Sequence, residues 1–222
     1  NRRTLEMLDR HPDETRVGVQ VTGRSAEEVA EAVAILDDHN FETIDINMGC
    51  PVQKVVKNGC GSAILKDPTR LAETVRLARK ATHKPLSIKI RLGWDRTSIN
   101  AVEVAKIAQN EGADWLTLHG RTRSDDYSTP VDLGWIAAVK KSVTIPVIAN
   151  GNILNIDSRD QAYSRTAVDG LMVSRGALGC PWIFQMLKGG STVISLEQWR
   201  KTLIRHIDLQ FETYGDDAGA AV

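Results

Sequence analysis

The segment Asn47-Met48-Gly49-Cys50-Pro51 has the residue types that most directly suggest chemistry. Gly49 and Pro51 favour a sharp turn at a strand end, and that turn would present the Cys50 thiol. An unperturbed cysteine thiol is mostly protonated at neutral pH, so it can donate a proton, and it becomes a nucleophile after deprotonation. A buried turn cysteine with no chemical role explains these residues equally well on their own.

A second candidate is Lys89, which lies inside the apolar run Ser87-Ile-Lys-Ile-Arg91. If Ile88 and Ile90 face the covering helices, Lys89 faces the other side of the strand. A buried ammonium needs an anionic partner, and a flavin, a phosphate or a carboxylate would serve. The alternative is a structural pair with a carboxylate of the core, such as Asp45.

Polar residues also follow three later apolar runs. His119 is followed by Gly120-Arg-Thr-Arg123, which favours an anion site over an isolated hydrogen-bonding histidine. Asn150-Gly-Asn152 and Ser174-Arg-Gly176 follow the last two runs, at positions where barrel loops bind phosphate through backbone N–H groups. Asn-Gly is also an ordinary turn, but two such loops favour phosphate. No second histidine or carboxylate stands at metal-ligand spacing, so we predict no metal site.

Basic residues near these run ends would form a positive rim on a neutral protein. Lys and Arg number 28, as do Asp and Glu, so bulk charge does not hold a nucleic acid. One interpretation is that these basic residues form an ordinary solvated surface. The other interpretation is that they contact nucleic-acid phosphates. The five residues are Lys54, Lys57, Arg91, Arg121 and Arg123.

Six apolar, β-branched runs predict the strands that position these residues. Their starts lie 26 to 43 residues apart, which is the length of a parallel βα unit with one longer insertion. Ser25, Asp67-Pro68 and Ser195 predict helix starts between or after the runs. The predicted strands are 16–21, 43–47, 86–91, 115–119, 144–150 and 170–174.

Repeated βα units fit either a TIM barrel or a doubly wound sheet. No GxGxxG follows the first run, which counts against a dinucleotide-binding sheet, and polar clusters after the strands would share the active rim of a barrel. We therefore predict an α/β fold, a TIM (β/α)8 barrel with six of its eight strands in this chain. Residues 1–187 would form this partial barrel, and residues 188–222 the first helix of a C-terminal helical domain. We expect the remaining strands and helices outside the chain.

Composition excludes several classes of protein. No run approaches the length of a membrane span, and residues 1–14 are too polar for a signal peptide. Cys50, Cys60 and Cys180 are too few and too scattered for a disulfide framework. These features favour a cytoplasmic protein without a membrane anchor, and no obligate protein partner is implied.

One specific segment and five supporting motifs make the sequence resemble the tRNA-dihydrouridine synthase family from about Val17 to Tyr214. The most specific piece runs from Ile46 to Ala63 and continues with Leu65-Lys-Asp-Pro68. One such motif would be weak, but five in order, each at a predicted strand end, are specific. The supporting pieces are Val19-Gln20, Ile88 to Trp94, His119 to Arg123, Ala149 to Gly151, and Met172 to Ala177 with Pro181-Trp-Ile-Phe184.

The resemblance implies an FMN-containing TIM barrel with a C-terminal helical domain that helps to hold tRNA. The family reduces the C5–C6 double bond of selected uridines with electrons from NADPH or NADH. By resemblance, Cys50 is the general acid, Asn47 lies near the uracil, and Gln20 and Lys89 contact the flavin ring. The resemblance assigns the FMN-binding set, mostly around the phosphate, to His119, Asn150, Gly151, Asn152, Ser174 and Arg175.

Two alternatives stay open at the level of sequence. One is a flavin-dependent reductase or dehydrogenase of a free pyrimidine, similar to dihydroorotate or dihydropyrimidine dehydrogenase. The other is a tRNA-binding relative without catalysis. The segment Tyr127 to Leu133 departs from the usual family pattern. We expect this departure to affect how the loop contacts tRNA and not the flavin chemistry.

Overall fold

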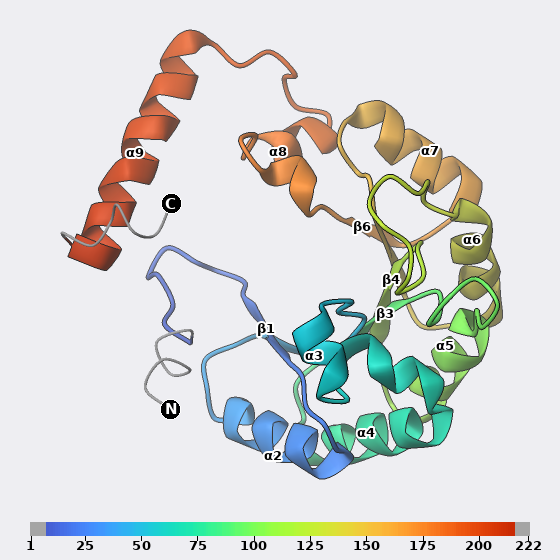
Figure 1. Ribbon diagram of the computed structural model, residues 1–222. Helices are drawn as coiled ribbons and strands as arrows, with labels where there is room; N and C mark the ends of the chain where they lie inside the picture. Colours follow the sequence, from blue (N-terminus) through green and yellow to red (C-terminus); the bar gives the residue numbers. More distant parts are fainter. Residues whose placement is uncertain (1–7, 216–222) are drawn as a thin grey trace. The chain divides into compact units, whose positions relative to one another are not determined.

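The computed structural model describes residues 8–215, and the chain separates into two compact units, Asn1–Cys180 and Pro181–Val222. Helices and strands alternate along the first unit (Figure 1). Its strands are β1 (Gly18–Val21), β2 (Thr43–Met48), β3 (Leu86–Arg91), β4 (Trp115–His119), β5 (Val147–Asn150) and β6 (Gly170–Met172). Its α-helices are α2 (Ala26–Asp37), α3 (Gln53–Lys57), α4 (Pro68–Ala81), α5 (Ala101–Asn110), α6 (Leu133–Ser142) and α7 (Ile156–Thr166), and its 3-10 helices are η1 (Gly61–Lys66) and η2 (Arg175–Ala177). The second unit contains α8 (Ile183–Leu187) and α9 (Leu196–Tyr214).

Among the described residues, six strands form one sheet in the order β1-β2-β3-β4-β5-β6, and every neighbouring pair is parallel. Each strand pairs with the next one along the chain, whereas a doubly wound sheet reverses its order at a switch point. Helices α2, α4, α5, α6 and α7 lie along the outside of the sheet in Figure 1. The predicted α/β class, with six strands of a TIM (β/α)8 barrel, is therefore confirmed.

The strand bounds differ from the predicted runs only at their ends. β3 and β4 coincide with the predicted ranges, while β5 begins at Val147 and not at residue 144. Pro146 has no N–H for the ladder, and the N–H groups of Thr144 and Ile145 donate to Oε1 of Gln109 instead. The side chain of Gln109 on α5 thus binds the segment that precedes β5.

Alternation along the strands separates an apolar face from a polar face. Parallel partners in register share a face, and the register joins Asn47 to Lys89, and Arg91 to His119. His119 is in turn the partner of Asn150. The outer face packs against the helices and contributes these buried strand residues to one core: Ile44, Ile46, Met48, Leu86, Ile88, Ile90, Leu116, Leu118, Val147 and Ala149.

The helix starts predicted from capping residues are confirmed. The side chains of Ser25 and Asp67 accept hydrogen bonds from backbone N–H groups three residues later, at the starts of α2 and α4. Ser195 and Gln198 form a reciprocal capping box at the start of α9. Among residues 8–215, no helix is both long enough and apolar enough to cross a membrane.

We expect Ile88→Ala to lower the free energy of unfolding by about 2–5 kcal/mol, because the substitution leaves a cavity between β3 and the helices. Ile88 is 0% exposed. Ile35→Ala is the matched control, since Ile35 is 56% exposed, and its effect should stay below about 0.5 kcal/mol. Urea unfolding measures both values, and equal losses would contradict the assignment of this face to the core.

Candidate active site

A cavity of about 300 Å³ lies at the C-terminal ends of the strands. Every strand of the sheet contributes to it, either directly or through the loop that follows. Its volume is at the lower end of the range for small-molecule sites. The lining residues are Gln20, Asn47, Gly49, Cys50, Pro51, Lys89, Arg91, His119, Tyr127, Asn150, Gly151, Asn152, Ile153, Leu154, Met172, Ser174, Arg175 and Gly176.

Hydrogen bonds hold the Cys50 turn from both sides. The Oδ1 atom of Asn47 accepts from the backbone N–H groups of Gly49 (3.2 Å) and Cys50 (2.9 Å). The carbonyl oxygen of Cys50 accepts from the backbone N–H of Ser62 (3.1 Å) and from its hydroxyl (2.5 Å). The half-buried Cys50 therefore lines the cavity on a fixed backbone.

Close packing around Gly61 makes this turn possible. A Cβ atom on Gly61 would lie 2.8 Å from the carbonyl oxygen of Cys50 and 2.9 Å from its Cβ. Gly61 also has a φ of +57°, a conformation that side-chain-bearing residues rarely adopt. The glycine is thus required both by its backbone conformation and by the position of Cys50.

A chain of side-chain hydrogen bonds continues from this turn to a carboxylate. Asn47 Nδ2 donates to Oε1 of Gln20 (2.7 Å), and Nε2 of Gln20 donates to Oδ2 of Asp45 (2.6 Å). The Ser87 hydroxyl donates to the other oxygen of Asp45. Burial raises the pKa of Asp45, although the hydrogen bonds from Ser87 and Gln20 oppose this shift. The carboxylate orients both amides, because an ionised carboxylate can only accept.

Lys89 is in register with Asn47 and lines the cavity without a partner. Within the part of the chain that the structure describes, its ammonium makes no hydrogen bond or ion pair, and Asp45 is engaged by Gln20 and Ser87. Burial and then the charge of Arg91 lower the pKa of Lys89. The structural pair with Asp45 is therefore not formed, and the ammonium is available to an anionic ligand.

His119 is buried at the end of β4 and stays neutral. Burial lowers its pKa to about 3, and the charges of Arg91, Lys89, Arg121 and Arg175 add to this effect. Its Nε2 atom lies 3.2 Å from Nη1 of Arg121. A guanidinium can only donate, so Nε2 accepts and the ring carries its proton on Nδ1.

The loops after β5 and β6 are tied together at the cavity. Asn150 Nδ2 donates to the carbonyl oxygen of Met172 (3.0 Å) and to the hydroxyl of Ser174 (3.1 Å). Asn152 has a φ of +54°, and its Oδ1 accepts from Nη2 of Arg175 (3.2 Å). The predicted phosphate-loop residues thus lie together, with Asn150 buried as a link between strands and Arg175 at the cavity wall.

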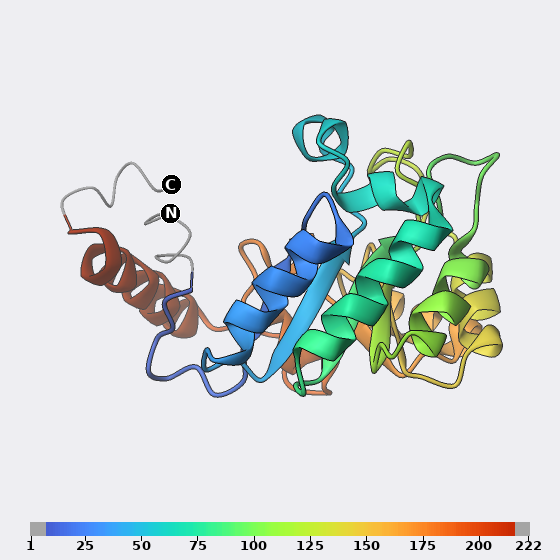
Figure 2. The same cartoon turned by 90° about the horizontal axis from the view of Figure 1, so that it is seen from below.

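The five basic residues of the predicted rim divide into different environments. Lys54 and Lys57 are exposed on α3, which projects beyond the strand ends in Figure 2. Arg91 and Arg121 are only 4% and 1% exposed. Arg123 is half-buried, with its guanidinium carbon 4.5 Å from the centre of the Trp94 ring. A rim of five exposed cations is not formed, because the buried Arg91 and Arg121 donate to loop carbonyl groups instead.

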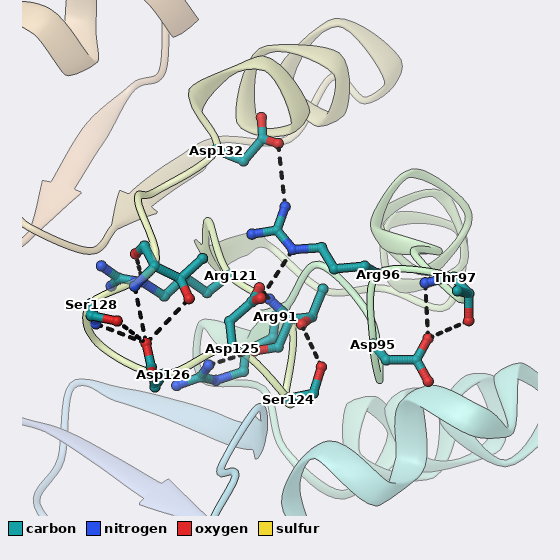
Figure 3. Close-up of polar contacts among 12 residues, drawn as sticks. Arg91, Asp95, Arg96, Thr97, Arg121, Ser124, Asp125, Asp126, Ser128 and Asp132 are labelled. Carbon is teal, nitrogen blue, oxygen red and sulfur yellow. Dashed lines mark hydrogen bonds and ion pairs between the residues drawn. The ribbon is translucent and has the colours of Figure 1, made fainter.

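Carboxylates organise the loops that follow β3 and β4 (Figure 3). Nε of Arg96 donates to Oδ1 of Asp125 (3.0 Å), and the other oxygen of Asp125 accepts from the backbone N–H of Thr122 (2.7 Å). Arg91 donates to the carbonyl oxygens of Gly49 (3.0 Å) and Thr122 (2.7 Å). The Cys50 turn and the loop after β4 are therefore joined through one buried guanidinium.

Sequence reasoning missed Tyr127 as a cavity residue. Its ring centre lies 3.9 Å from the guanidinium carbon of Arg175, in a stacking contact, and it lines the cavity. Ile153, Leu154 and Met172 supply an apolar part of the wall and were also missed. These residues lie on loops or at a strand end, where no periodic pattern marks their direction.

Charge in the cavity is strongly unbalanced. Lys89, Arg91 and Arg175 line it, and none of the described lining residues is an aspartate or glutamate. Within residues 8–215, no group of three or more histidine, cysteine, aspartate or glutamate side chains could hold a metal ion. The arrangement is suited to an anionic organic ligand with a polar end and an apolar part.

Comparison with known proteins finds tRNA-dihydrouridine synthases among the relatives of this chain. A family model described as "Dihydrouridine synthase (Dus)" matches residues 1–215. The chain is 37% identical over 218 residues to "Probable tRNA-dihydrouridine synthase" of Rickettsia prowazekii, covering 96% of this chain and 67% of that protein. It is 37% identical over 210 residues to "tRNA-dihydrouridine synthase B" of Pseudomonas putida, covering 92% and 62%. The chain thus spans about two thirds of the length of these curated relatives.

Solved structures with low sequence identity share the fold. An amine oxidase acting on 6-hydroxypseudooxynicotine from Pseudomonas geniculata N1 superposes with a TM-score of 0.57 at 14% identity, over 74% of this chain and 28% of that chain. A mandelate racemase/muconate lactonizing enzyme from Roseiflexus sp. gives a TM-score of 0.52 at 13% identity, over 73% and 41%. At this identity, the likeness concerns the fold alone.

We expect Gly61→Ala to destabilise the protein and to displace the Cys50 turn. The left-handed φ alone costs about 1–2 kcal/mol, and the contact with Cys50 adds to this loss. Gly59→Ala is the matched control, because Gly59 has a φ of +77° but its Cβ would meet only one atom, at 3.5 Å. Thermal unfolding and amide exchange at residue 50 measure the difference, and equal effects of the two variants would contradict the steric argument.

We expect the His119 ring to remain neutral from pH 8 to pH 5 in an NMR titration. The pKa of His119 is lowered from 6.5 to about 3 by folding, so below pH 6.5 the unfolded state binds a proton that the folded state does not. The contribution of His119 to folding stability is therefore complete above pH 6.5 and is lost as the pH falls toward 3. This loss is at most about 1.4 kcal/mol per pH unit, and His119→Gln should reduce the slope. A ring that titrates between pH 5 and 7 would contradict this result.

Proposed function

Because the chain belongs to the dihydrouridine synthase family, we propose that its barrel reduces the C5–C6 double bond of selected uridines in tRNA. Enzymes of this family depend on a flavin. Here the cofactor is FMN, with NADPH or NADH as the electron donor. The observation that carries the proposal is that the half-buried Cys50 and the unpartnered Lys89 line one cavity that has no carboxylate among its described lining residues.

The residues around the cavity suit FMN by their chemistry. The loops Asn150–Asn152 and Ser174–Gly176 offer polar groups and turn backbone beside Arg175, which would hold the phosphate. Lys89 and Gln20 lie on β3 and β1 and would contact the ring, where a positive charge favours an anionic reduced form. His119 would add a neutral hydrogen-bond donor. The chemistry that FMN supplies when bound is hydride donation to C6 of the uracil.

Cys50 is the proposed general acid. Hydride addition at C6 places negative charge on the uracil, and a proton must then reach C5. Cys50 would hold that proton on Sγ and donate it to C5, after which the thiolate is reprotonated from solvent. Asn47 fixes the backbone of this turn, and it would also lie beside the uracil.

Contact with tRNA is proposed for the exposed lysines and for Arg123. Lys54 and Lys57 lie on α3, a few residues after Cys50, so they would meet phosphates next to the reacting base. The base must leave its stack to enter the cavity, at a cost of a few kcal/mol, which favours a distorted tRNA loop. The buried Arg91 and Arg121 would support this surface from beneath.

We assign residues 1–187 to the FMN-binding barrel and residues 188–222 to the start of the tRNA-binding helical domain. This proposed boundary assigns α8 to the barrel and α9 to the helical domain, whereas the compact units divide after Cys180 and group α8 with α9. A cytoplasmic location is proposed, because the three cysteines are free and tRNA is the substrate.

The test is the dihydrouridine content of tRNA after incubation with the full-length protein and NADPH. We expect yellow wild-type protein that forms dihydrouridine, and Cys50→Ala protein that keeps its flavin but reacts about 10²–10⁴-fold more slowly. Cys60→Ala and Cys180→Ala are matched controls, which should retain the wild-type rate because neither cysteine lines the cavity.

Other outcomes separate the alternatives. Equal rates for wild type and Cys50→Ala would remove Cys50 from the mechanism. Turnover of a free pyrimidine but not of tRNA would favour the related class of pyrimidine reductases. Tight tRNA binding without any bound flavin would favour a protein that binds tRNA without catalysis.

A further inference from the structure

Arg121 is buried behind the cavity and contacts its wall without lining it. The side chain is 1% exposed. Its Nη1 lies 3.2 Å from Nε2 of His119, and its Nη2 donates to the carbonyl oxygen of Tyr127 (3.1 Å) and to Oδ1 of Asn152 (3.3 Å). Nε donates to the carbonyl oxygen of Thr129 (2.6 Å). Three of these four partners line the cavity, so Arg121 acts on any ligand there through them.

In the part of the chain that the structure describes, no carboxylate forms an ion pair with Arg121, although the charges of Asp125 and Asp126 act on it from a greater distance and oppose a lowering of its pKa. All four acceptors are neutral, and burial followed by the charge of Arg175 lowers the pKa of Arg121. A buried cation without a carboxylate in direct contact costs stability, so packing alone would be served better by a neutral side chain. The arrangement is explained if the guanidinium has a task at the cavity.

That task concerns the proton on His119. Because the guanidinium donates to Nε2, the neutral ring must carry its proton on Nδ1. Gly151 packs against the Nε2–Cδ2 side of the ring, since a Cβ atom at Gly151 would lie 3.0 Å from Cδ2 and 3.1 Å from Nε2. Nδ1 has no hydrogen-bond partner within residues 8–215, and His119 lines the cavity. The N–H group is thus the free donor of the ring.

We propose that Arg121 is a positioning residue that holds His119 as a neutral ring with its proton on Nδ1, directed at an oxygen acceptor of the anionic cofactor. This inference rests on the proposed function, because the cofactor supplies the acceptor. A neutral donor is suited to a cavity already lined by Lys89, Arg91 and Arg175, where a further positive charge would be repelled. The same guanidinium holds Asn152 and Tyr127 in place beside the donor.

The experiment compares three variants by ¹⁵N NMR of the histidine rings in ligand-free protein and by FMN titration. Arg121→Met removes the donor, and we expect His119 to move toward the Nε2–H tautomer and the Kd for FMN to rise about tenfold. Arg121→Lys retains one charged donor and should restore most of the Nδ1–H tautomer. Asp126→Ala is the matched control for the loop, since Asp126 accepts from the backbone of Ser128 and Thr129 without contacting His119 (Figure 3).

The Asp126→Ala control distinguishes an effect on the His119 tautomer from a general loosening of the loop. We expect Asp126→Ala to leave His119 in the Nδ1–H form even where the loop loosens. An unchanged tautomer in Arg121→Met, or an equal change in Asp126→Ala, would overturn the proposal. If the full-length wild type binds no FMN, the proposed function fails, whereas the ring resonances of the ligand-free protein still decide the role of Arg121. Should Arg121→Met not fold, the tautomer and FMN affinity of Arg121→Lys are compared with wild type, and Nε2–H in that variant would contradict the proposal.

Discussion

Register between parallel strands is the constraint on which the rest of the structure depends. Residues that are in register on neighbouring strands point to the same face of the sheet. The alternation of side chains along each strand therefore decides both which residues pack in the core and which residues face the cavity. Ile88 and Ile90 are buried against the helices, and the residue between them, Lys89, lines the cavity. A shift of β3 by one residue would place an ammonium in the apolar core and isoleucines in the cavity. The hydrophobic effect therefore also holds the polar residues of the site in position.

Positive charge without a matching carboxylate is the main electrostatic property of the site. The cations stand at strand ends and on the following loops, and together with burial they keep His119 neutral. Such an arrangement opposes folding, because like charges are held together in a region with little water. An anionic ligand would relieve this repulsion, so the same charges that lower stability would strengthen binding.

Backbone packing, by contrast, governs the position of Cys50. The turn is held by Asn47 on one side and Ser62 on the other, and Gly61 leaves the space in which it fits. Arg91 links the carbonyl group of Gly49 to the loop after β4. The thiol and the loop that carries the tyrosine of the cavity are thus parts of one hydrogen-bonded arrangement.

Sequence alone determined the order of strands and helices, the helix starts at Ser25 and Asp67, and the face taken by Lys89. These features follow from local periodicity and capping, which depend on residues near in the chain. Tertiary structure alone decided that Arg121 is buried, that Asp45 bonds Gln20 and not Lys89, and that Tyr127 stacks on Arg175. Each of these outcomes depends on distances between loops or strands far apart in the sequence, where exposure and hydrogen-bond partners are set by packing that no local pattern encodes.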